Sequence, residues 1–378
     1  MTPRGLDFLL EVDVQDSTIE KLVELSSKGM IPTGVIRKKS HLYVHLLEQT
    51  STQRVAEAVG PSIPVSLEKP PPKEENPPGT DWLIRIVSQR FTMERSMGSL
   101  LRTIRSLSGE VRGTDVVDMK LDGIDPSFLN IRLCTDDTVK LGTMKVDLLN
   151  FGEKMGFCMV INPMSIIKRP KGLVCFDLDS TLVNEELIVE VARVAGVEDE
   201  VEEITERAMA GELEYSQSFM HRLALLRGVK EEKLEEIWRK TRTAAEVNQL
   251  LTTLRMMGIK TAILSGAFSF FTERARDRLG TDFVIGTDVE ILEGRITGSV
   301  RGRIVNGAIK LEKMREFAAE LGLTLEEVVA VGDGANDLEI IREAGTGVAY
   351  DKGGLVKCYA DAILPHGKLG YLLHLIGA

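Results

Sequence analysis

The sequence is poor in cysteine and in long apolar runs, and each shortage excludes a class of protein. Its four cysteines, Cys134, Cys158, Cys175 and Cys358, form no close pairs, so neither a disulfide framework nor a cysteine-based metal site is expected. The apolar runs fall far short of the roughly 20 residues that cross a bilayer, and residues 1–16 lack the pattern of a signal peptide. We therefore expect a cytoplasmic protein with no membrane partner.

Positive charge is also scarce relative to negative charge. The 47 lysines and arginines face 57 aspartates and glutamates, which gives a formal net charge of -10. A surface of this sign repels a phosphate backbone, so no nucleic-acid partner is expected. A chain of 378 residues is longer than one ordinary domain, which predicts two or three domains with their own cores.

Three segments of the C-terminal half each predict a buried strand that ends in small or acidic residues. They are 174–183 (VCFDLDSTLV), 263–266 (ILSG) and 329–337 (VAVGDGAND). Apolar, β-favouring residues form each strand, and turn-forming residues follow it. Because ligands of open α/β sheets bind at the carboxyl ends of the strands, we expect the polar residues there to form one site.

Strands and helices alternate around these segments. The expected elements are helices within 185–239, then helix 245–257, strand 260–264, helix 270–279, a hairpin-like region at 285–305, helix 310–321, strand 328–331 and helix 337–343. Alternation at this spacing predicts an α/β fold with a doubly wound parallel sheet.

The N-terminal half predicts two units of the same element order, β-α-β-β-α-β. The first, residues 1–69, has expected strands at 7–14, 31–38, 41–47 and near Val65, with helices at 17–28 and 51–59. The second, residues 82–165, has expected strands at 82–87, 116–121, 128–134 and 157–161, a helix carrying Met97 to Leu107, and a helix at 138–155. Residues 70–81 concentrate proline with charge and predict a stiff linker. Both units have the α+β ferredoxin-like order.

With Lys310 between the second and third strand-end segments, the C-terminal half resembles the haloacid dehalogenase superfamily of phosphohydrolases, and within it the phosphoserine phosphatases. The resemblance implies a Rossmann-like domain at 166–378 with a small helical cap at about 185–245. The two N-terminal units resemble tandem ACT-type regulatory domains in topology only.

The resemblance also implies roles for the strand-end residues. Asp177 would attack phosphorus to give an aspartyl-phosphate, and Asp179 would act as acid and then base. Mg²⁺ would be held by the carboxylates of Asp177 and Asp333 and by the Asp179 carbonyl, because hard cations prefer oxygen ligands. Asp337 would hold the water molecules that bind the metal. The phosphoryl group would be bound by Ser265, the Gly266 amide and Lys310.

The expected cap supplies residues suited to an amino-acid substrate. Glu186 matches a family carboxylate that would bind the ammonium group of the substrate. Arg222 matches a family arginine that would bind the carboxylate of the substrate. The alternative for both is an exposed charge on a cap helix. Asn336 is also assigned to the substrate site. Two positions depart from the family pattern: Tyr215 replaces the usual phenylalanine, and Ala267 replaces a glycine of the phosphate-binding loop.

Together these features predict a Mg²⁺-dependent enzyme that hydrolyses O-phosphoserine to serine and phosphate. Its N-terminal units would bind an amino-acid effector, or would only dimerise or stabilise the enzyme, and a homodimer is expected. One alternative is a phosphotransferase that passes the phosphoryl group to another hydroxyl, such as that of homoserine. The other is an amino-acid sensor with a vestigial catalytic half, which the intact set of Asp177, Asp179, Lys310 and Asp333 disfavours.

Overall fold

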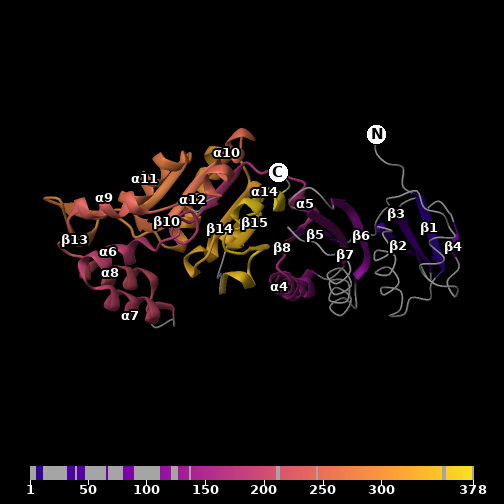
Figure 1. Ribbon diagram of the computed structural model, residues 1–378, viewed down its shortest axis with the longest axis horizontal. Helices are drawn as coiled ribbons and strands as arrows, with labels where there is room; N and C mark the ends of the chain where they lie inside the picture. Colours follow the sequence, from indigo (N-terminus) through magenta and orange to yellow (C-terminus); the bar gives the residue numbers. More distant parts are fainter. Residues whose placement is uncertain are drawn as a thin grey trace. The chain divides into compact units, whose positions relative to one another are not determined.

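The protein divides into two compact units, Met1–Lys168 and Arg169–Ala378. The computed structural model (Figure 1) describes residues 6–11, 32–38, 41–46, 65–66, 80–88, 111–120, 127–135, 138–209, 213–243, 246–350 and 355–376. The expected helices at 17–28, at 51–59 and over Met97 to Leu107 lie outside these residues, as does most of the predicted linker. Each unit is described by itself below.

The N-terminal unit contains two antiparallel four-stranded sheets with the same strand order. The first consists of β1 (Leu6–Glu11), β2 (Pro32–Lys38), β3 (His41–Leu46) and β4 (Val65–Ser66) in the order β2-β3-β1-β4. The second consists of β5 (Thr80–Ser88), β6 (Val111–Lys120), β7 (Ser127–Thr135) and β8 (Cys158–Pro163) in the order β6-β7-β5-β8. In each sheet the first strand pairs with the third and the fourth, as in a ferredoxin-like unit. The ACT-like assignment itself stays a prediction.

Helix α4 (Thr138–Met155) and the short helix α5 (Met164–Ile167) flank β8 in the chain. The core beside β5 and β8 is apolar, because Ile84, Ile161 and Leu148 are all fully buried. Strand β5 begins at Thr80, two residues inside the predicted linker. Thr80 and Asp81 extend the antiparallel ladder to β7, and this pairing across the sheet has no local sequence signal.

The C-terminal unit is built on a parallel sheet of six strands in the order β11-β10-β9-β14-β15-β16. The strands are β9 (Leu173–Phe176), β10 (Lys260–Phe268), β11 (Phe283–Thr287), β14 (Val328–Gly332), β15 (Thr346–Tyr350) and β16 (Ala362–Leu364). All residues of β9, β14, β15 and β16 are buried, which is typical of strands covered on both faces. The chain leaves β9 toward β10 and β11 and later returns to β14 on its other side. The carboxyl end of β9 is therefore a topological switch point.

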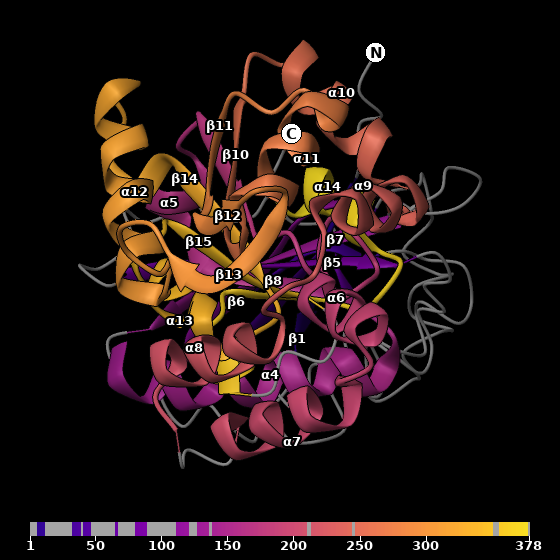
Figure 2. The same ribbon diagram turned by 90° about the vertical axis from the view of Figure 1, so that its left-hand side faces the viewer.

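Four helices cover the two faces of this sheet. Helices α10 (Val247–Met256) and α11 (Ser269–Leu279) lie on one side, and α12 (Gly307–Glu320) and α13 (Leu338–Glu343) on the other (Figure 2). This distribution follows from right-handed crossovers, since the crossovers through α10 and α11 run in one direction along the sheet and those through α12 and α13 run in the opposite direction. It confirms the predicted doubly wound α/β fold. Short elements complete this unit. They are the 3₁₀ turns Leu325–Glu327, Ala335–Asp337, Leu355–Cys358 and Leu369–Tyr371 and the short helix α14 (Leu372–Leu375).

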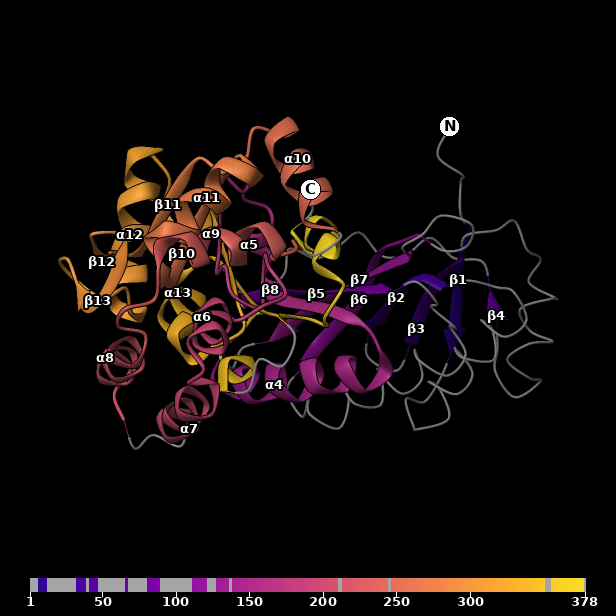
Figure 3. The same cartoon turned by 60° about the vertical axis from the view of Figure 1, so that its left-hand side comes forward.

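The segment between β9 and α10 folds into four helices: α6 (Leu187–Ala195), α7 (Glu198–Met209), α8 (Tyr215–Leu225) and α9 (Glu231–Lys240). Helices α7 and α8 lie on the far side of the unit from α10 (Figure 3). The hairpin of β12 (Val289–Leu292) and β13 (Arg295–Val300) packs against α8. None of the described helices is both long and apolar enough to cross a membrane.

Candidate active site

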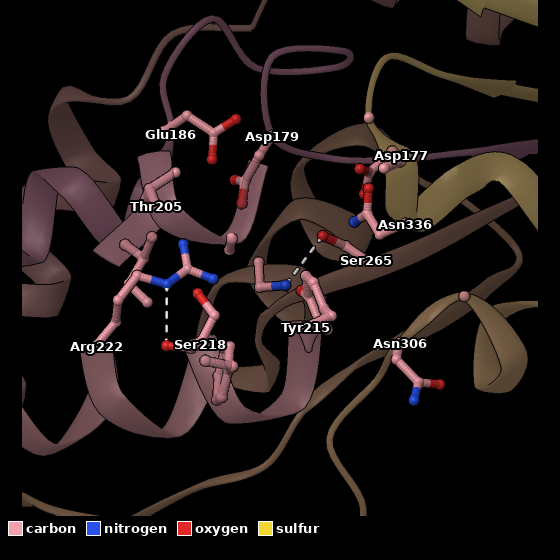
Figure 4. Close-up of a pocket in the computed structure, with 18 of the residues that line it drawn as sticks. Asp177, Asp179, Glu186, Thr205, Tyr215, Ser218, Arg222, Ser265, Asn306 and Asn336 are labelled. Carbon is pink, nitrogen blue, oxygen red and sulfur yellow. Dashed lines mark hydrogen bonds between the residues drawn. The ribbon is translucent and has the colours of Figure 1, made fainter. Parts of the chain in front are cut away.

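A cavity of about 470 Å³ lies at the carboxyl ends of β9, β10 and β14 (Figure 4). This volume suits a small molecule. The predicted site residues that line it are Asp177, Asp179, Glu186, Tyr215, Arg222, Ser265, Gly266, Asp333 and Asn336. Lys310 and Asp337 do not line it, because both are fully buried beneath its wall.

Asp177 follows β9 directly and is held in place by its own backbone and its neighbour. Its amide donates a hydrogen bond to the carbonyl of Val331 (3.0 Å), and the Leu178 amide donates to Asp177 Oδ1 (2.8 Å). The Asp177 side chain is 6% exposed, and Oδ2 makes no hydrogen bond with a described residue. One oxygen is thus fixed while the other remains available to a ligand.

Lys310 lies on α12 and joins two carboxylates from different strand ends. Its Nζ lies 3.0 Å from Asp177 Oδ1 and donates to Asp337 Oδ1 at 2.7 Å. Burial alone would lower the pKa of Lys310, but the charges of Asp177 and Asp337 outweigh this effect and raise it. Lys310 therefore remains a cation, and the α12 N-cap Asn306, which accepts from the Ile309 amide (3.1 Å), fixes the start of its helix.

Asp177, Asp333 and Asp337 form an acidic cluster at the base of the cavity. One carboxylate oxygen from each lies within 4.8 Å of the others. Gly332 permits this approach, because a Cβ there would collide with the Asp337 carboxylate. Asp337 already accepts from Lys310 and, at Oδ2, from the Gly334 amide (3.2 Å). The Asp177 and Asp333 carboxylates are therefore better placed to bind a cation directly.

The acidic side chains of this site have raised pKa values, because burial and the neighbouring negative charges both disfavour their ionised forms. Burial and the charge of Asp177 raise the pKa of Asp333 to about 8 and that of Asp337 to about 7. Burial, Glu186 and Asp177 raise the pKa of Asp179 well above its usual value. A hard divalent cation would relieve this repulsion, so the donor set fits Mg²⁺.

A tight turn carries the chain from Asp177 to Glu186. The amides of Thr181, Leu182 and Val183 all donate to the carbonyl of Leu178. Ser180 has a φ of 53°, which is rare for a residue with a side chain, and its Oγ donates to Glu186 Oε1 (3.1 Å). The turn thus aims both Asp179 and Glu186 at the cavity.

The segment containing Ser265 and Gly266 belongs to β10, although the sequence predicts a strand end at Leu264. The strand continues to Phe268 with a shift of its register against β11. Ser265 Oγ accepts from the Ala267 amide (3.1 Å). Since Ala267 lies in the strand and its φ is not positive, alanine fits where the family pattern has glycine.

Helix α8 presents one face to the cavity through Tyr215, Ser218 and Arg222. Glu214 caps the helix by accepting from the amides of Ser216 (3.0 Å) and Gln217 (3.2 Å). Glu186 and Arg222 point toward one another across the cavity (Figure 4), and Arg222 moderates the raised pKa of Glu186, which burial and Asp177 cause.

Sequence reasoning missed Ser218, although it lies one helical turn before Arg222. Its carbonyl accepts from Arg222 Nε (3.4 Å). The Ser218 hydroxyl is buried beside the cavity and has no hydrogen-bond partner among the residues that the structure describes. Thr205 of α7 also lines the cavity. The spacing of i and i+4 on one helix was the available signal for Ser218.

Residues 172–345 match the haloacid dehalogenase-like hydrolase family. The chain is 42% identical over 217 residues to a phosphoserine phosphatase of Archaeoglobus fulgidus, a match that covers 57% of this chain and 63% of that protein. It is 35% identical over 210 residues to the phosphoserine phosphatase of Methanocaldococcus jannaschii, covering 56% of this chain and 100% of that protein.

A solved structure of a substrate-bound phosphoserine phosphatase complex is also similar. The TM-score is 0.52 at 34% identity, and the match covers 55% of this chain and 99% of that one. The likeness spans nearly all of that shorter protein, whereas the chain matches less than two thirds of the Archaeoglobus protein.

Proposed function

The chain belongs to the haloacid dehalogenase-like hydrolases, and we propose that it is a Mg²⁺-dependent phosphatase that hydrolyses O-phospho-L-serine to L-serine and inorganic phosphate. The support is a single cavity that joins a nucleophilic carboxylate, Asp177, to two side chains of opposite charge, Glu186 and Arg222. The identity to phosphoserine phosphatases supports the same substrate.

In the proposed reaction, Asp177 Oδ2 attacks phosphorus and the bond from phosphorus to the serine oxygen breaks. Asp177 Oδ1 is held by Lys310 and the Leu178 amide, so the free oxygen can approach in line with the leaving group. The product of this step is an aspartyl-phosphate. Lys310 lowers the cost of bringing a phosphate anion beside Asp177, because it supplies positive charge where water cannot screen it.

Asp179 is the proposed proton carrier. Its raised pKa, caused by burial, Glu186 and Asp177, keeps a proton on the carboxyl group at the first step. That proton passes to the departing serine oxygen, and the resulting carboxylate takes a proton from the water that attacks the aspartyl-phosphate. The two steps return Asp177 and Asp179 to their starting states and release phosphate.

We propose Mg²⁺ at the acidic cluster, held by the carboxylates of Asp177 and Asp333 and by the Asp179 backbone carbonyl. The ion supplies Lewis-acid neutralisation of the phosphoryl oxygens. Asp337, whose oxygens accept from Lys310 and from the Gly334 amide, orients Lys310 and the waters of the ion.

Magnesium should stabilise the protein more at high pH than at low pH. In the folded, metal-free protein Asp333 keeps its proton up to about pH 8, against an ordinary value of 3.8. The free energy of unfolding of the metal-free protein therefore falls as the pH rises through this window, because the unfolded chain binds fewer protons. Since Mg²⁺ binds the carboxylate, the rise in melting temperature that it causes should be larger at pH 8 than at pH 5.

Melting temperatures measured with chelator and with Mg²⁺ at several pH values test this expectation. Asp333→Asn should lose most of the Mg²⁺-dependent rise, since a neutral amide attracts the ion far less. A rise of equal size at pH 5 and pH 8 in the wild type would contradict the assignment of the ion to these carboxylates.

Arg222→Ala tests the proposed substrate. Phosphate release from O-phosphoserine and from p-nitrophenyl phosphate should be measured for the wild type and the variant, each with and without Mg²⁺. We expect kcat/KM for phosphoserine to fall by roughly 10- to 100-fold, the loss of one charge-assisted contact. The aryl phosphate has no carboxylate for the guanidinium and should be affected little.

Arg227→Ala is the matched control, because Arg227 follows the same helix and is exposed outside the cavity. No phosphate release from phosphoserine by the wild type would refute the proposed function. Equal losses on both substrates would assign Arg222 a structural role. Transfer of the phosphoryl group to added homoserine in place of water would favour the phosphotransferase alternative.

We further propose that the N-terminal unit binds an amino-acid effector and that the protein is a homodimer. The repeated strand order of its two sheets supports regulatory domains of ACT type. Serine inhibition that excess phosphoserine cannot overcome, and that disappears when residues 1–168 are deleted, is the expected behaviour. Unchanged inhibition after the deletion would leave these domains a structural role.

A further inference from the structure

The hydroxyl of Tyr215 lies against the strand segment that carries Ser265 and Gly266. Tyr215 is the first residue of α8, so its position is set by the Glu214 cap. A Cβ on Gly266 would collide with the Tyr215 hydroxyl, which therefore sits directly beside the Gly266 backbone. Figure 4 shows the Tyr215 ring reaching toward Ser265.

This hydroxyl makes no hydrogen bond with any residue in the described part of the chain. Its surroundings are strongly charged: Lys310, Arg222, Asp177 and Asp179 all act on it electrostatically. Tyr215 is partly buried and lines the cavity, so its hydroxyl is open to a molecule there. A tyrosine hydroxyl in such a place ordinarily finds a hydrogen-bond partner. The partner is therefore expected from a molecule in the cavity.

We propose that the Tyr215 hydroxyl donates a hydrogen bond to a nonbridging phosphoryl oxygen of the substrate. This proposal rests on the proposed function only in requiring that the cavity binds a phosphate ester. Ser265 and the Gly266 amide are proposed donors to the same group, and the hydroxyl lies beside them. A phenylalanine ring at this position would fill the same space but could not donate.

The geometry also assigns different parts of the substrate to two residues of α8. Tyr215 begins the helix beside Gly266, whereas Arg222 lies nearly two turns later and faces Glu186. The hydroxyl should therefore act on every phosphate ester, while Arg222 acts only on esters that carry a carboxylate. This difference separates a phosphoryl contact from a contact with the amino-acid part.

Tyr215→Phe tests the proposal, because it removes one oxygen and keeps the ring. We expect kcat/KM to fall by roughly 10- to 100-fold, and by a similar factor, for O-phosphoserine and for p-nitrophenyl phosphate. Inhibition by orthovanadate, which mimics the pentacoordinate transition state of phosphoryl transfer, should weaken as well. The shape of the pH profile should not change, since the hydroxyl donates a hydrogen bond but transfers no proton.

Tyr359→Phe is the control, because it removes an exposed phenol outside the cavity. Unchanged kinetics and unchanged vanadate inhibition in Tyr215→Phe would overturn the proposal, and so would a loss confined to phosphoserine. A loss that merely follows a lower melting temperature would also overturn it. If the wild type hydrolyses the aryl phosphate but not phosphoserine, the proposed function fails while the Tyr215 comparison still stands. If it hydrolyses neither, calorimetric vanadate binding to wild type and variant gives the same comparison.

Discussion

Asp177→Asn is expected to reduce phosphate release by at least several orders of magnitude, the loss typical of removing a catalytic nucleophile. The amide has almost the same size as the carboxylate, and its oxygen can still accept from the Leu178 amide. Asp177 also contributes to the raised pKa values of Asp179, Asp333 and Asp337. Removing its charge therefore relieves repulsion, and we expect no loss of thermal stability in the absence of Mg²⁺.

Steady-state phosphate release and thermal unfolding in chelator measure the two effects. Asp277→Asn is the matched control, because Asp277 is an exposed aspartate of α11 outside the cavity. Substantial turnover by purified Asp177→Asn would contradict the nucleophile assignment. A large drop in melting temperature would show that the charge of Asp177 is mainly needed to hold Lys310.

Lys310→Met should impair both activity and stability. The ammonium is fully buried between Asp177 and Asp337, and removing one partner of such a group leaves uncompensated buried charge, at a cost of about 3 to 5 kcal/mol. Activity should fall by roughly 100- to 1,000-fold, because the positive charge beside the phosphoryl group is lost. The destabilisation should be larger at pH 8 than at pH 5, because burial and the charge of Asp177 raise the pKa of Asp337 to about 7, so the Asp337 carboxyl group can take up a proton at the lower pH.

A second substitution separates the two effects of Lys310. The double variant Lys310→Met/Asp337→Asn also lacks the buried negative charge of Asp337. Its stability should therefore recover in part, whereas its activity should not. Lys313→Met is the control on the same helix, because Lys313 is partly exposed and, among the described residues, forms an ion pair with Glu316 alone. If Lys310→Met melts like the wild type in chelator at pH 8, the buried pairing contributes little to stability.

Local sequence determined much of the C-terminal fold. The segments that end at Asp177 and Asp333 are short apolar runs followed by turn formers, and both form the buried strands that they predict. The helix predicted at 270–279 begins one residue earlier, at Ser269. These features depend on neighbours in the chain, so periodicity and turn chemistry suffice to find them.

Interactions between distant segments could not be found in this way. The continuation of β10 to Phe268 depends on its pairing with β11, not on the local turn-forming residues at 265–266. The Ser218 hydroxyl finds no partner in the described part of the chain, and this depends on the way α8 packs at the cavity. A serine on a helix has the same local sequence pattern whether it is exposed or buried.

The sequence by itself therefore determined which side chains gather at the carboxyl ends of the strands, because strand direction and chain order bring those ends to one edge of a parallel sheet. Only the tertiary structure decided how they meet. It buries Lys310 against Asp337, 27 residues away in the chain, and it brings the Tyr215 hydroxyl against the Gly266 backbone. Such contacts depend on how helices from separate parts of the chain pack onto the sheet, which no local pattern encodes.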